Sequence, residues 1–197
     1  MTLSVFSAQA GTVERWRTVR QQAALRQALA KLPRLAALAY FDDRAFNPPA
    51  SPPLAIEGGI FITLVGPAPD GHPVTRACWG SLRPDAPDLA AAVAQFGAAV
   101  LHEDYRQKPV QPAELAHLQF VISLVGPLVP VNEHEQLRPM AEGLYLTDGS
   151  RGAVLLPGEA RTAAWQDATC RQKAGIAPKA HVYRYRFRTL VIEEPQR

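Results

Sequence analysis

The sequence has little cysteine, and the cysteines that occur form no disulfide or metal-binding pattern. Only Cys78 and Cys170 are present among 197 residues, and neither belongs to a C-x-x-C motif. Disulfide-stapled folds and zinc modules need several cysteines at short spacings. We therefore expect a fold built on a hydrophobic core, with no metal, in the reducing cytoplasm.

Long apolar runs are also missing. The most apolar window, residues 86–101, is rich in alanine and contains Asp88 and Gln95, so it is too short and too polar to span a bilayer. The first ten residues lack the basic start and long apolar core of a signal peptide. We expect neither a signal peptide nor a membrane-spanning segment.

Neither sign of charge is in large excess. Lys and Arg total 21 against 18 Asp and Glu, a net charge of +3. Tight non-specific binding to nucleic acid needs several clustered phosphate contacts. Two arginine-rich stretches keep weak nucleic-acid binding open as an alternative: a helix expected over residues 13–32, and a strand expected over residues 182–192. The simpler interpretation is that the arginines of the helix are solvated and that those of the strand pair with neighbouring carboxylates, such as Glu193 or Glu194. Those of the strand are Arg184, Arg186 and Arg188.

The familiar motifs of nucleotide binding and hydrolysis are absent. The sequence contains neither G-x-x-x-x-G-K-[ST] nor G-x-G-x-x-G. Residues 149–152 are one residue short of G-x-S-x-G, and each H-E pair, at His102 and at His134, is followed by arginine where H-E-x-x-H needs histidine. We therefore expect no cofactor.

Turn residues and periodicity predict strands interrupted by helices. Strands are expected over residues 59–65, 75–82, 118–125, 143–147, 152–156 and 182–192, and helices over residues 13–32, after Asp85 and over residues 160–174. Asp70-Gly71 and Asp148-Gly149 predict turns, so we expect one hairpin from the first two strands and another from residues 143–147 and 152–156. Gly175 is expected to end the last helix in the left-handed conformation, and the alanines and Gly97 predict that the helix after Asp85 packs closely against another element. Runs of strands without strict alternation favour an α+β fold. We expect a mainly antiparallel sheet with flanking helices, arranged as two subdomains that share one core.

A proline-rich stretch separates the N-terminal segment from the remainder. Residues 47–53 read N-P-P-A-S-P-P, which excludes a helix or a central strand. We expect an N-terminal helical segment over residues 1–46, a connection over residues 47–57 and an α+β domain over residues 58–197, in one compact whole.

Cys78 is the candidate for chemistry. In a strand, Arg76, Cys78 and Gly80 lie on one face, and a nearby guanidinium favours a thiolate. Gly80 would leave space above the sulfur for a ligand or another backbone. The alternative is a buried structural cysteine, because free cysteine is among the most buried residue types.

Several blocks at and beyond this strand resemble the AMMECR family, whose bacterial members are called AmmeMemoRadiSam system protein A. Residues 59–64, G-I-F-I-T-L, match the family pattern G-[LIV]-F-V-T-L, and Arg76, Cys78 and Gly80 match L-R-G-C-I-G. The following block, D-P-R-F-x-P-L-T-x-E-E-L, is matched by Asp104, Arg106, Pro109, Glu114 and Leu115. Departures at Thr75, Ala77, Trp79, Tyr105 and Gln107 mark a divergent member.

The resemblance implies an α+β fold of two subdomains, and an accessory role beside Memo-like and radical SAM proteins. The family has no established biochemical activity. We therefore expect a binding module, in which Arg76, Gly80, Asp104 and Arg106 hold a small anionic ligand or a partner segment. An enzyme that depends on Cys78 is the alternative. Its general base would be His72 or His102.

Overall fold

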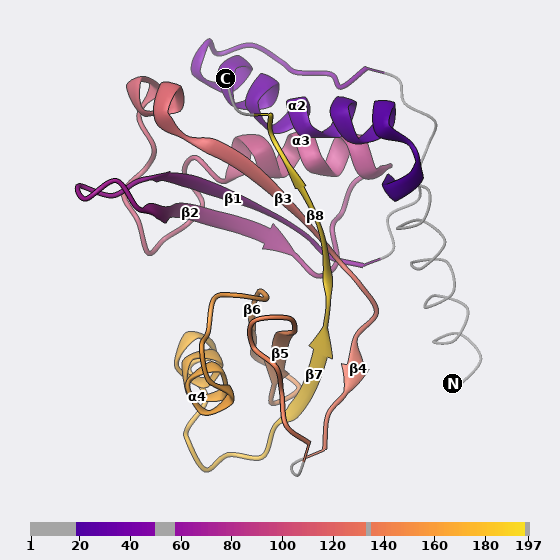
Figure 1. Ribbon diagram of the computed structural model, residues 1–197, viewed down its shortest axis with the longest axis vertical. Coiled ribbons are helices and arrows are strands. Elements are labelled where there is room, and N and C mark those ends of the chain that lie inside the picture. Colours follow the sequence, from indigo (N-terminus) through magenta and orange to yellow (C-terminus); the bar gives the residue numbers. More distant parts are fainter. Residues whose placement is uncertain (1–18, 50–57, 133–134, 196–197) are drawn as a thin grey trace. The chain divides into compact units, whose positions relative to one another are not determined.

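The computed structural model describes residues 19–49, 58–132 and 135–195. Contacts divide it into two compact units: unit 1 comprises the chain up to Val125 and from Leu190 onward, and unit 2 comprises Gly126–Thr189. Each unit contains a four-stranded antiparallel sheet with helices packed against it (Figure 1). The predicted α+β class, with antiparallel sheets and flanking helices, is confirmed.

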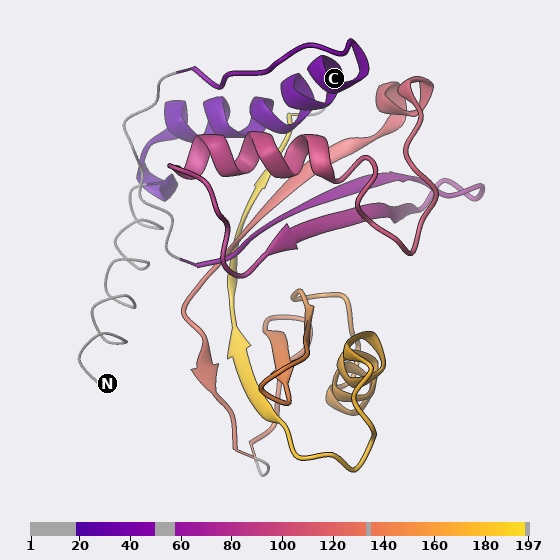
Figure 2. The same cartoon turned by 180° about the vertical axis from the view of Figure 1, so that it is seen from behind.

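Unit 1 is built on a sheet with the strand order β2-β1-β3-β8. Its elements are α2 (Ala23–Phe41), β1 (Ile60–Pro67), β2 (Pro73–Ser81), α3 (Leu89–Ala99), the 3-10 helix η1 (Pro112–His117), β3 (Gln119–Val125) and β8 (Thr189–Glu193). The helices α2 and α3 lie side by side over the sheet in both views (Figures 1 and 2). The β1–β2 hairpin predicted from the sequence is confirmed.

The core of unit 1 follows from strand alternation. Ile60, Ile62 and Leu64 on β1 are almost completely buried, as are Phe120 and Ile122 on the neighbouring β3. They pack with buried residues of α2 and α3 in one apolar cluster. Successive side chains of a strand point to opposite faces, so the intervening residues of these strands lie on the other face of the sheet.

The two helices approach each other most closely at Gly97. A Cβ atom built on Gly97 would lie 2.4 Å from Pro33 Cα, so only glycine allows this approach. The alanines and Gly97 predicted close packing, which is confirmed. The expected helix end at Leu32 is wrong, since α2 continues through Pro33 to Phe41. Packing against α3 offsets the hydrogen bond that a proline removes from a helix.

Helix α3 begins later than expected. Its N-cap is Asp88, whose side chain accepts a hydrogen bond of 2.9 Å from Ala91 N–H, whereas we had expected Asp85 to cap it. Both aspartates lie shortly before the apolar run of the helix, so the sequence alone allows either of them to be the N-cap. The burial of Leu89 and Ala90 selects the later start, because these residues must lie within the helix to face the core.

Unit 2 contains a second sheet, with the strand order β4-β7-β5-β6. Its elements are β4 (Val129–Pro130), β5 (Gly143–Thr147), β6 (Gly152–Leu155), α4 (Ala163–Ala174) and β7 (Tyr183–Phe187). The predicted β5–β6 hairpin is confirmed, as is Gly175 in the left-handed conformation after α4. Unit 2 contains an apolar cluster formed by buried residues of β5, β6 and α4 and of the segments after α4.

The strand expected over residues 182–192 is in fact two strands. β7 belongs to the sheet of unit 2 and β8 to the sheet of unit 1, and Arg188 lies between them. The buried positions also change at this point, from Phe187 in β7 to Leu190 and Ile192 in β8. The apolar alternation therefore shifts by one residue at the break, a signal that the prediction of a single strand overlooked.

Two further expectations concern regions that the structure describes incompletely. Residues 13–18 of the expected first helix and residues 50–57 of the expected connection lie outside the described residues. Within the described ranges, no helix is both long and apolar enough to cross a membrane.

The approach of α3 to Pro33 generates a prediction. Replacing Gly97 with alanine should lower the free energy of unfolding by about 1–3 kcal/mol, because the added methyl group forces two helix backbones apart. Urea denaturation measures the change. Gln95→Ala, at an exposed position of the same helix, is the control and should have little effect. An unchanged or higher stability for Gly97→Ala would show that the helices separate without cost.

Candidate functional site

Strand β2 carries the residues that the sequence singled out. Ala77 is buried, and Trp79 packs against the core of unit 1. Arg76, Cys78 and Gly80 alternate with these two residues and so lie on the opposite face. The tryptophan that replaces isoleucine in the family pattern therefore contributes to the core side of the strand and leaves the face with Cys78 unaltered.

Asp104 and Arg106 take the place of a neighbouring strand along β2. This strand is the edge of its sheet, so its outward backbone groups have no strand beside them. At Cys78, the N–H donates to Asp104 Oδ2 at 3.0 Å, and the carbonyl lies 3.5 Å from Arg106 Nη2. Arg106 also donates to Asp104 through Nε at 2.7 Å and Nη2 at 2.9 Å.

Arg76 is engaged in a second ion pair. Its Nε donates to Glu114 Oε2 at 2.6 Å, and its Nη2 donates to Glu114 Oε1 at 3.1 Å. Nη2 also lies 3.1 Å from the carbonyl oxygen of Lys108. Glu114 in turn accepts a hydrogen bond from Gln111 N–H at the start of η1. The pair therefore fastens the segment before η1 to the edge strand.

These contacts determine the charge state of the carboxyl groups. Burial by itself would raise the pKa of Asp104, but hydrogen bonds from Arg106 and from Cys78 N–H outweigh it and hold the pKa below its usual value. The hydrogen bond from Arg76 is the largest influence on Glu114, and it lowers the pKa of that group as well. Both carboxyl groups are therefore ionised at neutral pH.

The Cys78 thiol is half-buried beside Thr63, its partner on β1. The Thr63 hydroxyl donates a hydrogen bond to Cys78 Sγ at 3.4 Å. Of the two histidines considered as a base, His72 lies at the β1–β2 turn, six residues or about 20 Å along the strand from Cys78. His102 stacks on Tyr40, with 4.9 Å between ring centroids.

Gly80 allows the backbone of the neighbouring strand β1 to approach β2 closely. A Cβ atom at this position would lie 2.1 Å from the carbonyl oxygen of Ile60 and 2.6 Å from Phe61 Cα. Of the two uses that the sequence left open for this glycine, space for a ligand or close approach of a backbone, the structure has the second.

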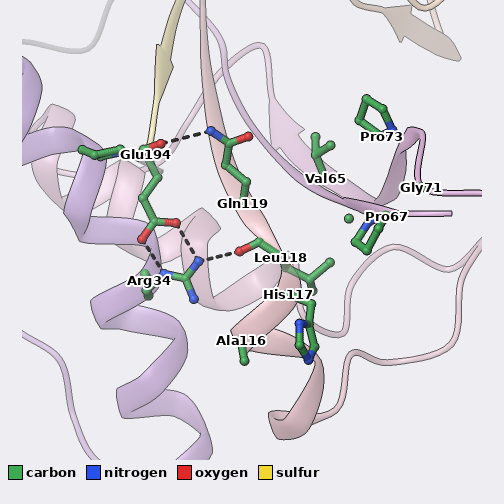
Figure 3. Close-up of a pocket in the computed structure, with 12 residues that line it drawn as sticks. Arg34, Val65, Pro67, Gly71, Pro73, Ala116, His117, Leu118, Gln119 and Glu194 are labelled. Carbon is green, nitrogen blue, oxygen red and sulfur yellow. Dashed lines mark hydrogen bonds and ion pairs between the residues drawn. The ribbon is translucent and has the colours of Figure 1, made fainter. Parts of the chain in front are cut away.

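A pocket of about 420 Å³ lies elsewhere in unit 1, where β1 and β3 diverge. Figure 3 shows Arg34 and Glu194 on one side of it, and Val65, Pro67 and Pro73 on the other. The two charged side chains are nearly buried and form an ion pair with each other, with an Nη2–Oε2 distance of 2.7 Å. No sequence motif pointed to this pair, because its members are 160 positions apart.

The arginines of β7 do not form an outward cationic stripe. Arg184 Nε donates to Asp167 Oδ1 on α4 at 2.6 Å. Arg184 also pairs with Leu146 on β5, and Leu146 belongs to the core that α4 covers. Pairing with a carboxylate was the simpler interpretation of these arginines, and it is confirmed for Arg184, although with Asp167 rather than with Glu193 or Glu194.

Comparison with known proteins assigns this arrangement to a family. The AMMECR1 family model matches residues 17–192, nearly the whole chain. The chain belongs to the AMMECR1 family.

Two curated proteins and one solved structure are also similar to this chain. A protein of Thermotoga maritima is 32% identical over 99 residues, which is 50% of this chain and only about half, 55%, of that protein. A protein of Thermococcus gammatolerans is 30% identical over 168 residues, covering 77% of this chain and 80% of the relative. The crystal structure of the uncharacterized protein PH0010 from Pyrococcus horikoshii shares the fold. Its TM-score is 0.69 at 22% identity, over 84% of this chain and 89% of that one.

The structure gathers the AMMECR1 signature residues in one place. Arg76, Cys78, Gly80, Asp104 and Arg106 all lie on or against strand β2, which we call the β2-edge surface. Sequence reasoning did not single out Thr63, Glu114 or Tyr105 as site residues. Glu114 had a signal, since it matches a glutamate of the family pattern. Tyr105 had been noted only as a departure from that pattern, yet 77% of it is exposed.

Across residues 19–49, 58–132 and 135–195, no group of three or more His, Cys, Asp or Glu residues is arranged to hold a metal ion.

The low pKa of Asp104 generates a second prediction. Asp104→Asn should lower the free energy of unfolding by about 1–3 kcal/mol at pH 7, because the neutral amide loses the charge-assisted hydrogen bonds to Arg106. A carboxyl group with a lowered folded pKa stabilises the fold above its unfolded pKa of about 4, and this contribution is lost as the pH falls through the folded value. The difference between variant and wild type should therefore shrink below pH 4.

Chemical denaturation at several pH values tests this. Asp85→Asn, at an exposed position, is the control and should change the stability little at any pH. A difference for Asp104→Asn that stays constant from pH 7 to pH 3 would contradict the assignment.

Proposed function

We propose that this AMMECR1 protein is an accessory binding module, and that its β2-edge surface holds a partner protein. The observation that carries the proposal is Tyr105, which is 77% exposed and lies between two anchored neighbours, Asp104 and Arg106. Exposed tyrosines held in place by rigid surroundings are common energetic centres of protein interfaces. Arg76 and Glu114 support the segment that follows.

The charges of this surface support a partner protein more than a small anion. Arg76 is already paired with Glu114, and Arg106 with Asp104. An anionic ligand would have to displace a carboxylate from one of these guanidinium groups. A protein surface can contact the exposed tyrosine and leave both ion pairs intact, so binding requires no rearrangement of charge.

The family resemblance suggests which partners to test. It implies an association with Memo-like and radical SAM proteins, and an accessory protein needs a stable surface more than a catalytic group of its own. The same surface would then present Tyr105 to one of these enzymes.

The interaction can be measured with purified proteins. We expect the chain to bind the Memo-like or the radical SAM protein of the same organism in surface plasmon resonance. Tyr105→Ala should weaken that binding by about 10-fold or more, as truncation of a hot-spot tyrosine does, with little change in thermal stability. Leu35→Ala, which removes an exposed apolar side chain from α2, is the control and should bind as wild type does. Absence of binding to both enzymes, or equal affinity of the tyrosine variant, would refute the proposal.

A Cys78-dependent enzyme remains the second candidate, and one contact favours it. The hydroxyl hydrogen bond from Thr63 would stabilise a thiolate at Cys78. Nucleophilic cysteines also need a base or a strong positive field. The guanidinium groups of Arg76 and Arg106 supply such a field only in part, because each is paired with a carboxylate.

Alkylation distinguishes the two functions. If the chain is a binding module, Cys78 should react with iodoacetamide at pH 7 no faster than a cysteine in a short peptide. An activated nucleophile would react at least about 10-fold faster. The Cys78→Ser variant supplies the background from Cys170, which should be unreactive because burial raises the pKa of its thiol to about 12. A fast reaction confined to Cys78 would support the enzyme.

A further inference from the structure

The sheet of unit 2 has two chemically different faces. Helix α4 packs against β5 and β6, and the buried side chains there include Leu144, Leu146 and Leu155, together with Cys170 of the helix. Arg184 lies on this same face and pairs with Asp167 of α4. The guanidinium groups of β7 are thus directed toward the helix, and the aromatic residues that alternate with them lie on the other face.

The strand register identifies every residue on that other face. Tyr145 is the cross-strand partner of Tyr185 on β7 and of Val154 on β6. Along each strand, the residues two positions before and after these three lie on the same face. No residue in the resulting set carries a charge. In the described strands, the set consists of Pro130, Gly143, Tyr145, Thr147, Gly152, Val154, Tyr183, Tyr185 and Phe187.

Three tyrosines dominate this surface, which we call the tyrosine face: Tyr145, Tyr183 and Tyr185. The rings of Tyr145 and Tyr185 are stacked, with centroids 5.8 Å apart and planes at 25°. Tyr183 is 52% exposed and meets His181 edge-on at 5.2 Å. Gly152 makes room for Tyr145, since a Cβ atom there would lie 2.8 Å from Tyr145 Cε2. The sheet therefore holds the rings in defined positions.

The location of these rings on the sheet suggests which class of ligand stacks on them. Tyr145 and Tyr185 lie on β5 and β7, the two central strands of a four-stranded antiparallel sheet whose opposite face is covered by a helix. Aromatic residues on the central strands of such a sheet stack with unpaired bases in RNA-recognition modules. Every base has a flat π-surface, so stacking of this kind tolerates many sequences.

The charges around the tyrosine face complement a phosphate backbone. The face itself has no carboxylate, and the exposed cation Lys179 precedes the aromatic row of β7. Arg188, which follows the row, alternates in step with Arg184 and so belongs to the opposite face. The chain as a whole carries a net charge of +3. We propose that the tyrosine face binds single-stranded nucleic acid by stacking bases on Tyr145, Tyr183 and Tyr185, with Lys179 contacting a phosphate.

This inference differs from the arginine-stripe hypothesis and does not depend on the partner surface of unit 1. The stripe required Arg184 to face a phosphate, whereas Arg184 is paired with Asp167 under α4. On the other face of the same strand, Tyr183 is exposed and Tyr185 is half-buried, whereas Phe187 is buried. Tyr183 is therefore the ring of β7 most accessible to a ligand.

Fluorescence anisotropy with labelled single-stranded oligouridine and oligothymidine, at about 50 mM salt, tests the proposal with the full chain. Tyr183→Ala and Tyr185→Leu should each weaken binding by about 5-fold or more, because each removes one stacking surface. Tyr183→Phe should bind as wild type does, since phenylalanine keeps the ring. Trp165→Ala is the matched control, because it removes an exposed aromatic residue from α4 in the same unit. Circular dichroism checks folding, and Tyr183→Ala decides the outcome if Tyr185→Leu is unfolded.

Salt dependence tests the phosphate contact separately. Lys179→Ala should reduce the slope of log affinity against log salt by about one and leave the effect of the tyrosine variants unchanged. Arg188→Ala, which removes an exposed cation whose alternation matches that of Arg184, is the control and should change the slope little. Four outcomes would overturn the proposal: no binding at low salt, equal affinity for duplex and single strand, tyrosine variants that bind as wild type does, and a proline-rich peptide that binds the face in place of the oligonucleotides. None of these outcomes bears on Tyr105 or on the partner enzymes.

Discussion

The buried ion pair between Arg34 and Glu194 holds the ends of unit 1 together. Arg34 comes from helix α2, and Glu194 follows β8, the last strand of the chain. The guanidinium group also donates to the carbonyl of Leu115 at 2.7 Å and to that of Leu118, and it lies 5.0 Å from the ring centroid of Phe120. Removing water from two charges is costly, and a buried pair is stable only when hydrogen bonds replace that water. Here the carbonyls of Leu115 and Leu118, and the N–H of Phe120 on β3, supply the replacement.

At the edge strand β2, side chains likewise replace hydrogen-bond partners that the backbone would otherwise lack. An edge strand exposes backbone groups that would otherwise pair with another chain. Asp104 and Arg106 satisfy those groups at Cys78 with side chains, and they hold Tyr105 outward in doing so. Protection of the edge and presentation of an exposed aromatic residue are therefore two results of one arrangement. Changing either charged residue would alter both the stability of the edge and the surface offered to a partner.

Local features of the sequence predicted much of the fold. Both hairpins, the helix that ends at Gly175 and the close packing around Gly97 follow from turn residues, glycine and short-range periodicity. The errors arose where one local pattern was followed past its end. The apolar positions of residues 182–192 shift by one residue between Phe187 and Leu190, where the chain passes from one sheet to the other. Pro33 lies inside a helix because a neighbouring helix supports it.

The sequence by itself determined the α+β class, the hairpins and the grouping of Arg76, Cys78 and Gly80, because these depend on residues close together in the chain. Only the tertiary structure decided that Asp104 and Arg106 grip β2 at Cys78, that Glu114 neutralises Arg76, and that the arginines of β7 turn toward α4 while its tyrosines face away. These contacts join residues from 17 to 38 positions apart. No periodic pattern specifies such a pairing, which is selected when the chain folds and buried charges must find partners.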